Sequence, residues 1–421
     1  MATDLFRAFR NRNYTLYFSG QSVSQIGTWM QRTGVYWVIF SLTHSSFMLG
    51  VAVFATQFPS FLFSLYGGII SDRYDRYKVL LITQVASMVQ AILLTVLILT
   101  GHYVVWEILS LSVILGIINA FDVPVRQPLV HELVHNKDDL PNALALNSSM
   151  NNIARLLGPA LSGIVLQRFG AGICFLFNAL SFVAVLGSLL LMKLPRSAVR
   201  PVRQKTAAEL SEGFTYLKHN PLLRTILILL ALLSLLVLPY NTLLPVFAKN
   251  IFKGNAATFG YLNSCIGLGA ICGTLFLASL KQGADLKLIL LTNTILLGIA
   301  LILFSRADSL PLALMIAVLC GFGTMSQTTI CITMIQVHSD PGKRGRMMSF
   351  VAMAYFGMLP LGSLLTGALS QHIKAPATLL IQGIMAIVIA GLFFKFLSHD
   401  RLSKKAKGDS SDTENPLMEE R

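Results

Sequence analysis

The chain has 421 residues, of which 54% are hydrophobic and only 12% are charged, and its mean hydropathy is +0.67. Soluble domains carry about 25% charged residues, so this composition argues against a soluble globular protein. The 33 Lys and Arg residues exceed the 19 Asp and Glu residues, giving a formal net charge of +14. Because a nucleic-acid-binding protein would not surround its charges with so much hydrocarbon, the positions of the basic residues matter more than their number.

Long apolar segments follow one another along the chain, separated by short polar stretches or by Gly and Pro. Each is close to the roughly 20 residues that cross the hydrocarbon core of a bilayer as a helix. The pattern predicts an all-α integral membrane protein with twelve transmembrane helices, over residues 14–42, 47–70, 77–100, 104–128, 142–167, 172–193, 222–248, 257–280, 286–305, 310–336, 345–371 and 375–397.

Two segments lie outside these predicted spans. Residues 194–221 form a basic linker, within which AAELSEGFTYL predicts an amphipathic surface helix. Residues 398–421 are polar and predict a disordered tail. The linker divides the chain into two predicted six-helix bundles, residues 1–193 and residues 222–397.

Lys and Arg predict the orientation in the membrane, because positive loops are retained on the cytoplasmic side. With the N-terminus inside, the linker and tail are cytoplasmic, and so are both termini. The basic residues left on the opposite side are Arg168, Lys249, Lys253, Arg306 and Lys374. Arg32 and Arg155 fall within helices, so topology does not explain them.

The two predicted halves share small residues at similar positions. A shift of 204 residues places Gly158 on Gly362, Ser162 on Thr366, Gly163 on Gly367 and Gln167 on Gln371. A shift of 205 residues places Gly68 on Gly273 and Gly116 on Gly321. Small residues mark close helix contacts in membranes, so the matches predict two related bundles.

The loop after the second span carries the most specific local pattern, which runs from Gly68 through Asp72, Arg73 and Arg76. Gly68 is expected to let a helix approach, and Asp72 to pair with a basic group or a helix N-terminus. A charged turn kept inside by its arginines would explain the basic residues but not the spacing of Gly and Asp.

This loop resembles the G-x-x-x-D-R-x-x-R signature of the major facilitator superfamily. The resemblance implies a conformational latch between the two halves in the outward-facing state, formed by Gly68, Asp72, Arg73 and Arg76. Asp75 stands where many members have Gly, and Leu277 replaces the acid in the second half. The latch is therefore expected on one side only.

Longer stretches extend the resemblance over nearly all of residues 5–397. They resemble the drug:proton antiporter branch of that superfamily, which includes the enterobactin exporter and macrolide efflux pumps. The resemblance implies the major facilitator fold, alternating access and proton-driven export across the inner membrane of a bacterium, without a cofactor or a catalytic residue. The stretches are NRNYTLYFSGQSVSQIGTWMQR (11–32), FDVPVRQPLVHELV (121–134), NALALNSSMNNIARLLGPALSG (142–163) and GRMMSFVAMAYFGMLPLGSLLTGAL (345–369).

Gly158, Pro159 and Gly163 resemble the antiporter signature of the fifth helix, although Ala154 and Ala145 stand near positions where that signature has glycines. Pro159 frees a backbone carbonyl and is expected to kink the helix. The two glycines are expected to permit close packing against a neighbouring helix, with the bend at the interface between the halves. A proline kink without a mechanistic role is the alternative interpretation.

One face of the first span is polar and aromatic, with spacings of 4, 4, 3 and 4 residues, which is a helical period. It is unsuited to lipid and is expected to line a central cavity; its members are Gln21, Gln25, Trp29, Arg32 and Tyr36. Arg32 could bind an anionic or phenolate substrate, or form a structural ion pair. Arg155, beside the Gly-Pro pair, is expected to be structural or to take part in gating.

Few acids are available for proton coupling. Asp122 lies one turn before Arg126 near the cytoplasmic end of the fourth span, and Glu107 lies near the other end. Asp122 could carry a proton, or could form a structural cytoplasmic gate with Arg126 and Asp72. Polar residues of the fourth, seventh and tenth spans are further cavity candidates: Asn119, Tyr240, Asn241, Thr324, Gln327 and Thr328.

His131, Glu132 and His135 match H-E-x-x-H, the pattern in which two His bind zinc and Glu activates water. Asp138 and Asp139 follow in a charged loop and make poor third ligands, so no metal site is predicted. We expect a monomeric exporter of a siderophore, drug or similar molecule, with protons as the coupling ion. The alternatives are an importer of a small organic solute or metal chelate, and a membrane zinc protease.

Overall fold

A computed structural model describes residues 6–134, 136–192, 206–281 and 283–412 of the chain. These residues form helices and loops, and no strand occurs among them, so the predicted all-α class is confirmed. The elements are η1 (Arg7–Arg10), α2 (Arg12–Thr43), α3 (Ser46–Arg73), α4 (Arg76–Leu99), α5 (Val105–Leu133), η2 (Lys137–Asp139), α6 (Leu140–Leu190), α7 (Thr206–His219), α8 (Pro221–Leu236), η3 (Leu238–Leu243), α9 (Leu244–Val246), η4 (Phe247–Ile251), α10 (Ala256–Ala278), α11 (Leu286–Ser305), α12 (Leu310–His338), α13 (Arg344–Ala352), η5 (Met353–Gly357), α14 (Met358–Ile373) and α15 (Ala375–Asp412).

The short polar stretches between the apolar segments cap the helices. Ser45 accepts a hydrogen bond from Met48 N at the start of α3, and Asp75 accepts from Tyr77 N at the start of α4. Asn255 caps α10 in the same way. These side chains satisfy backbone N–H groups that a helix leaves unpaired at its first turn, so they fix where each helix begins. Asp75 thus has a structural role in place of the Gly expected by resemblance.

Ten helices among the described residues are long and apolar enough to cross a membrane. One of them, α6, counts once although Gly170 interrupts its helical dihedrals, with φ 84° and ψ 174°. This glycine lies between the fifth and sixth predicted spans. The first predicted span corresponds to α2, which is not among the ten because its polar face lowers its hydropathy. The count of twelve therefore stays a prediction.

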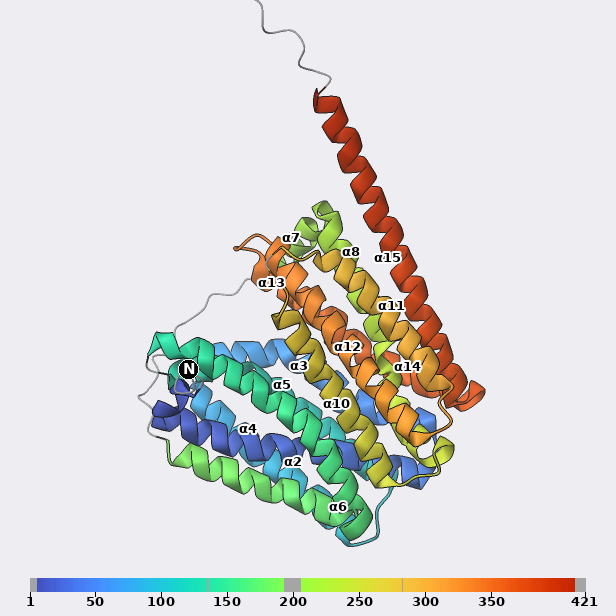
Figure 1. Cartoon of the computed structure of the whole chain (residues 1–421). Helices are drawn as coiled ribbons and strands as arrows, with labels where there is room; N and C mark the ends of the chain where they lie inside the picture. Colours follow the sequence, from blue (N-terminus) through green and yellow to red (C-terminus); the bar gives the residue numbers. More distant parts are fainter. Residues whose placement is uncertain (1–5, 135, 193–205, 282, 413–421) are drawn as a thin grey trace, which may run out of the picture.

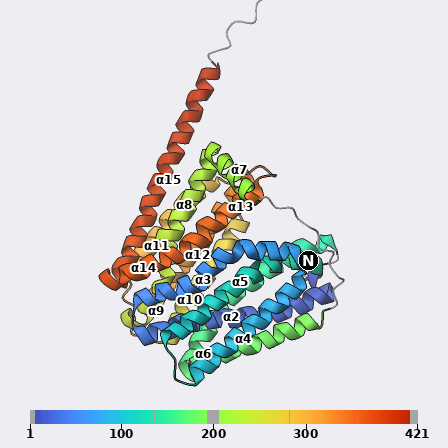
Figure 2. The ribbon, with the colours of Figure 1, turned by 180° about the vertical axis from the view of Figure 1, so that it is seen from behind.

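The helices form two bundles that diverge toward one end of the molecule, as the two opposite views agree (Figures 1 and 2). One bundle contains α2 to α6, and the other contains α8 and α10 to α15. The order of the elements follows the predicted division into halves, whose boundaries stay a prediction.

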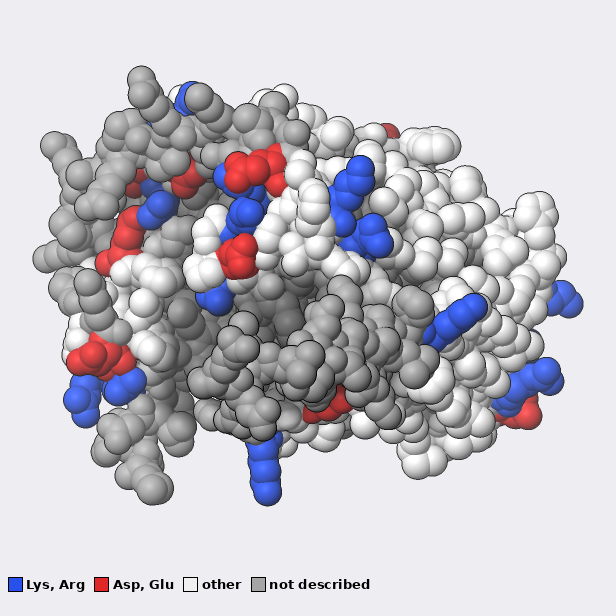
Figure 3. All heavy atoms as spheres, turned by 90° about the horizontal axis from the view of Figure 1, so that it is seen from above, with Lys and Arg blue, Asp and Glu red and all other residues white. Residues whose placement is uncertain are grey.

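The linker helix predicted from AAELSEGFTYL is present as α7. It packs on α13, where Arg346 Nη1 lies 2.8 Å from Glu212 Oε1 and the rings of Phe214 and Phe350 meet edge to face. Residues 194–205 of the predicted linker fall outside the described residues. Figure 3 shows acidic and basic side chains beside one another on the face seen from above.

The tail is described only in part. The backbone of α15 stays helical to Asp412, and the disorder predicted from residue 398 onward stays a prediction. Continuation of a helix beyond its apolar part needs no further apolar residue, because each added residue gains a hydrogen bond to the preceding turn. Residues 413–421 fall outside the described residues.

Glycines at the contact between the bundles confirm the predicted internal repeat. A Cβ at Gly163 of α6 would lie 2.7 Å from Ala256 O of α10, and a Cβ at Gly367 of α14 would lie 2.6 Å from Ser46 O of α3. The two glycines are 204 residues apart, and their two contacts are 210 residues apart. The helix pairs α6–α10 and α3–α14 are therefore built alike.

The reciprocal contacts obey the same relation. A Cβ at Gly260 would lie 2.5 Å from Pro159 O, and a Cβ at Gly50 would lie 2.5 Å from Ser363 O. Backbone atoms of one bundle thus touch backbone atoms of the other, which only glycine permits. We call these two contacts together the closed end. It consists of the α3–α14 contact, in which residues 45–50 meet residues 363–371, and the α6–α10 contact.

Hydrogen bonds complete the closed end. Ser45 Oγ donates to Gln371 Oε1 at 3.1 Å, and Ser370 Oγ donates to Ser46 Oγ at 3.1 Å. Ser264 Oγ of α10 donates to Leu156 O of α6 at 2.7 Å. The opposite end, where the bundles diverge in Figure 1, carries η1 and the α3–α4 loop of one bundle and α7 and α13 of the other.

Two glycine predictions need comment. A Cβ at Gly68 would meet nothing within 4 Å, so the predicted close approach is not made in this structure, and the latch role of Gly68 stays a prediction. The preceding residue, Gly67, makes it: a Cβ there would overlap Ala120 O of α5. Successive residues of a helix are rotated by about 100° around its axis, so Gly67 can face α5 while Gly68 faces open space.

The fifth-helix signature packs as predicted but does not break the helix. A Cβ at Gly158 would overlap Trp29 Cβ of α2, while Gly163 contacts α10, so α6 lies tightly against both neighbours. The interruption of α6 lies at Gly170 and not at Pro159. The kink predicted at Pro159 stays a prediction.

Candidate functional site

A buried ion pair joins three helices of the first bundle. Arg126 Nε of α5 lies 2.5 Å from Asp122 Oδ2, and Arg126 Nη1 donates to Gln21 Oε1 of α2 at 2.7 Å. Thr83 Oγ1 and Gln84 Nε2 of α4 both donate to Asp122 Oδ1 at 2.8 Å. The carboxylate is 2% exposed and its charge is matched by one guanidinium and two neutral donors. Gln21 therefore belongs to this network and not to an open cavity wall.

The second bundle repeats this network without charge. Gln327 Oε1 of α12 accepts from Thr294 Oγ1 of α11 at 2.9 Å and from Asn293 Nδ2 at 3.3 Å. Asn293 and Thr294 lie 210 residues after Thr83 and Gln84, and Gln327 lies 205 residues after Asp122. Gln327 is fully buried between α11 and α12, so its predicted place on the cavity is wrong. Its side chain serves the packing of two neighbouring helices.

Two arginines meet one indole ring where the bundles face each other. The guanidinium carbons of Arg32 on α2 and Arg155 on α6 each lie 5.4 Å from the centroid of Trp29. Arg32 Nε also donates to the hydroxyl of Tyr36 at 3.3 Å. Gly158 makes this arrangement possible, because only its missing side chain lets α6 approach the Cβ of Trp29. We call Trp29, Arg32 and Arg155 the arginine–tryptophan cluster.

The second bundle contributes polar and soft groups to this cluster. Arg155 Nη1 contacts Met325 Sδ of α12 at 3.6 Å, and Tyr240 of η3 shares a hydrogen bond of 3.3 Å with Thr324. Tyr355 of η5 lies near both arginines. Sequence reasoning missed Met325 and Tyr355; a tyrosine in the middle of the eleventh predicted span was the available signal for the latter.

Neither Arg32 nor Arg155 forms an ion pair with any acid in the part of the chain that the structure describes. The structural ion pair that the sequence left open for Arg32 is thus not observed there. Both side chains are partly exposed, so they remain accessible between the bundles. Arg155, expected to be structural, lies beside Arg32.

The remaining cavity candidates are spread more widely. Gln25 and Asn119 are partly exposed on α2 and α5, and Asn241 is exposed in η3. Thr328 Oγ1 donates to the carbonyl of Thr324 one turn earlier. Whether these four residues line the transport path stays a prediction.

Glu107 has a local role at the start of α5. Its Oε2 accepts a hydrogen bond from Val104 N at 3.0 Å, and the residue is exposed. It therefore caps the helix, as acidic residues at a first turn commonly do. This contact gives it no connection to Asp122, so the predicted coupling role of Glu107 receives no support.

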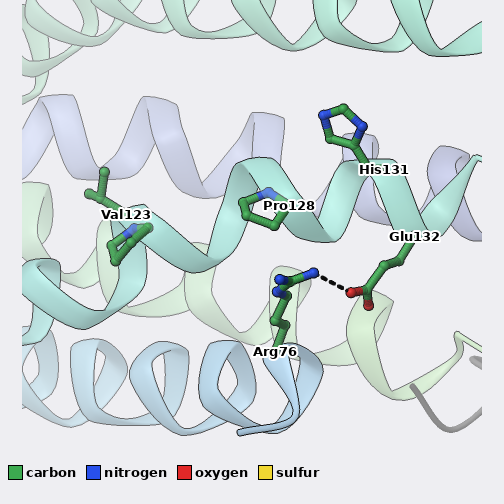
Figure 4. Close-up of a pocket in the computed structure, with 6 residues that line it drawn as sticks. Arg76, Val123, Pro128, His131 and Glu132 are labelled. Atoms are coloured by element: carbon green, nitrogen blue, oxygen red, sulfur yellow. Dashed lines mark hydrogen bonds and ion pairs between the residues drawn. The ribbon is translucent and has the colours of Figure 1, made fainter. Parts of the chain in front are cut away.

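A pocket of about 660 Å³ lies in the first bundle, at the end where the two bundles diverge. It is lined by Arg76, Val123, Pro124, Pro128, His131 and Glu132. Figure 4 shows Arg76 reaching from α4 toward Glu132 of α5, and their Nη1 and Oε1 atoms are 2.6 Å apart. Arg76 Nε also donates to Ser71 O at 3.2 Å. The predicted latch residue Arg76 thus joins the α3–α4 loop to α5, while Arg73 is exposed.

The same ion pair accounts for the glutamate of the H-E-x-x-H pattern. Glu132 is engaged by Arg76, and His131 is exposed. His135 lies outside the described residues. Within those residues, no group of three His, Cys, Asp or Glu side chains could hold a metal ion.

Two pseudo-symmetric helical bundles, a closed end of interlocking glycines and a polar cluster between the bundles define a membrane transporter of the major facilitator type. Solved structures share this fold: a POT family transporter in complex with a thioalcohol-conjugated peptide (TM-score 0.74, 14% identity, covering 92% of this chain and 96% of that one) and a bacterial homolog of the human lysosomal transporter Spinster in an inward-facing, unoccupied conformation (TM-score 0.71, 12% identity, 91% and 96%).

The chain belongs to the MFS_3 family, described as "Transmembrane secretion effector", whose pattern matches residues 3–421. It is similar to the staphyloferrin A transporter of Staphylococcus aureus, at 28% identity over 90% of this chain and 94% of the relative. It is also similar to macrolide efflux protein A of Streptococcus pyogenes (21%, 90% and 94%) and to the enterobactin exporter EntS of Shigella boydii (26%, 85% and 85%). The chain is therefore a multi-pass membrane transporter.

Proposed function

We propose that the protein exports a siderophore, a drug or a similar medium-sized organic molecule by alternating access. The observation that carries the proposal is the arginine–tryptophan cluster, which lies between two bundles joined at one end and divergent at the other. The similarity to a macrolide efflux protein and to an enterobactin exporter supports the direction of transport. Transport needs binding and gating and no covalent chemistry, so no catalytic residue is part of the proposal.

The orientation is proposed from the basic loops. With both termini in the cytoplasm of a bacterial cell, the closed end faces the outside and the diverging end faces the cytoplasm. The structure then corresponds to an inward-facing state, in which a substrate can enter from the cytoplasm. Rocking of the bundles would open the α3–α14 and α6–α10 contacts and release the substrate outside. We propose that one copy of the chain suffices.

Protons are the proposed coupling ion, and Asp122 is the proposed carrier. The second bundle supports this choice, because Gln327 takes the same place in the same kind of network without a charge. Helix packing alone therefore does not require an acid at this position. Protonation of Asp122 would release Arg126 from its partner and change the contact with Gln21 of α2.

Reconstitution in liposomes tests the proposal. Siderophores, macrolides and dyes are screened for flux under an imposed pH gradient, with the purified full chain. We expect at least one compound to move against its concentration gradient when protons move the other way, and Asp122→Asn to abolish the response to the gradient. Gln327→Glu is the matched control for a change at the equivalent site. Flux that does not respond to the pH gradient and is unchanged in Asp122→Asn would refute proton coupling. Movement of the compound in the same direction as the protons would indicate import.

A further inference from the structure

The arginine–tryptophan cluster holds two positive charges that no acid among the described residues balances. Arg32 and Arg155 come from helices α2 and α6, within predicted spans, and each approaches the same ring of Trp29 at 5.4 Å. A cation inside a membrane protein is costly unless an acid, a carbonyl or water compensates it. Two cations at one ring are costlier, because they also repel each other.

The neighbours of the cluster from each packed element are neutral. Tyr36 of α2 accepts from Arg32, and Met325 of α12 contacts Arg155. From the second bundle, Tyr355 lies near both arginines and Tyr240 lies near Arg155. A phenol or a thioether offers a dipole or a polarisable sulfur, and neither cancels a full charge.

Arg126 shows that the chain supplies an acid to an arginine buried within one bundle. Its guanidinium lies 2.5 Å from Asp122 in the interior of the first bundle. Arg32 and Arg155 differ from it in two ways, since no described acid pairs with them and their side chains are partly exposed. Because the two guanidinium groups are partly exposed and no described acid neutralises them, a bound ligand is the best source of the negative charge.

We propose that Arg32 and Arg155 together bind an acidic substrate, one that carries at least two carboxylate groups or an equivalent doubly charged oxyanion. This inference rests on the proposed export function and assigns its substrate class. Guanidinium groups recognise carboxylates through two parallel hydrogen bonds, so each arginine can hold one carboxylate. Tyr240 of the opposite bundle, which shares a hydrogen bond with Thr324, would add a hydroxyl to this site, so that binding links both halves.

Citrate and its trimethyl ester serve as the test pair, because they share a skeleton and differ in charge. Binding is measured on the full chain in phosphatidylcholine nanodiscs, which contain no lipid with a net negative charge. We expect wild-type protein to bind citrate and to bind the ester at least about tenfold more weakly. Arg32→Gln and Arg155→Gln should each weaken citrate binding by about tenfold to 100-fold. Arg155→Lys should lose less, since it keeps the charge but not the paired donors.

Lys249→Gln is the matched control, because Lys249 also lies over an aromatic ring, Phe40 at 5.9 Å, but outside the cluster. It should bind citrate as wild type does. Equal binding of citrate and ester by wild type, or wild-type citrate binding in both arginine variants, overturns the acidic-substrate site. The export function has its own test. It fails if the reconstituted protein moves no compound even though citrate binding depends on both arginines. If the protein exports neutral or cationic compounds and both arginine variants export them normally, the export function stands and the acidic-substrate site is refuted.

Discussion

The closed end should open when its two symmetric glycines gain a methyl group. In Gly163→Ala the new Cβ would lie 2.7 Å from Ala256 O, and in Gly367→Ala it would lie 2.6 Å from Ser46 O, whereas ordinary contacts begin at 3.4 Å. The obstructing atoms are backbone, which no rotamer change can move away. The helices must therefore separate by about 0.7 Å or more at each contact, relative to ordinary packing distances.

Overpacking of this kind costs about 1–3 kcal/mol per site. If the cost falls on the conformation in which the helices touch, each substitution lowers the ratio of closed to open molecules about 5-fold to 150-fold. Alanine also favours helix over glycine by about 1 kcal/mol, but this gain is the same in both conformations. Gly68→Ala is the control, because a Cβ there meets nothing within 4 Å.

Double electron–electron resonance measures the distance between nitroxides attached at Leu42→Cys and His372→Cys, and so reports the opening. The labels are placed in a variant whose five native cysteines are replaced. Leu42 and His372 flank the Ser45–Gln371 hydrogen bond. We expect the long-distance population to grow in the two alanine variants and to stay at the wild-type level in Gly68→Ala. A double alanine variant with the wild-type distance distribution would refute the assignment of these contacts to the closed end.

Three further predictions concern stability, measured by thermal unfolding of the purified chain in detergent. Asp122→Asn should cost about 3 kcal/mol, because it leaves Arg126 without its anion, whereas Gln327→Ala at the neutral counterpart should cost about 1 kcal/mol; equal losses would contradict this difference. Gly67→Ala should destabilise by about 1–3 kcal/mol, and a variant as stable as wild type would show that α3 and α5 are not in backbone contact. Arg76→Gln should cost no more than about 1 kcal/mol, since its ion pair is partly exposed, and a larger loss would mean that the latch loop holds the bundle together.

Features with a local signal could be predicted from the sequence. The helical class follows from the apolar segments, and the capping residues follow from the polar stretches between them. Asp122 and Arg126 pair because four residues separate them on one helix. The internal repeat was visible because glycines at equivalent contacts keep their spacing in both halves.

Features made by distant residues could not be predicted. Arg155 reaches Trp29 because Gly158 lets two helices touch, and no pattern within either helix shows which ring an arginine will meet. Glu132 resembled a zinc-site residue until its partner from another helix was known. A single position decides whether Gly67 or Gly68 packs, since helix rotation is set by all the contacts of a helix together.

The most direct test of the account is flux through a chain whose closed end can be locked. Ser45→Cys and Gln371→Cys, whose native side chains are hydrogen bonded at 3.1 Å, are joined in liposomes by a short cross-linker that a reductant can cleave. For a compound that the unlinked protein exports, the account predicts that cross-linking abolishes flux and that reduction restores it. Undiminished flux through the cross-linked protein would contradict alternating access across this contact.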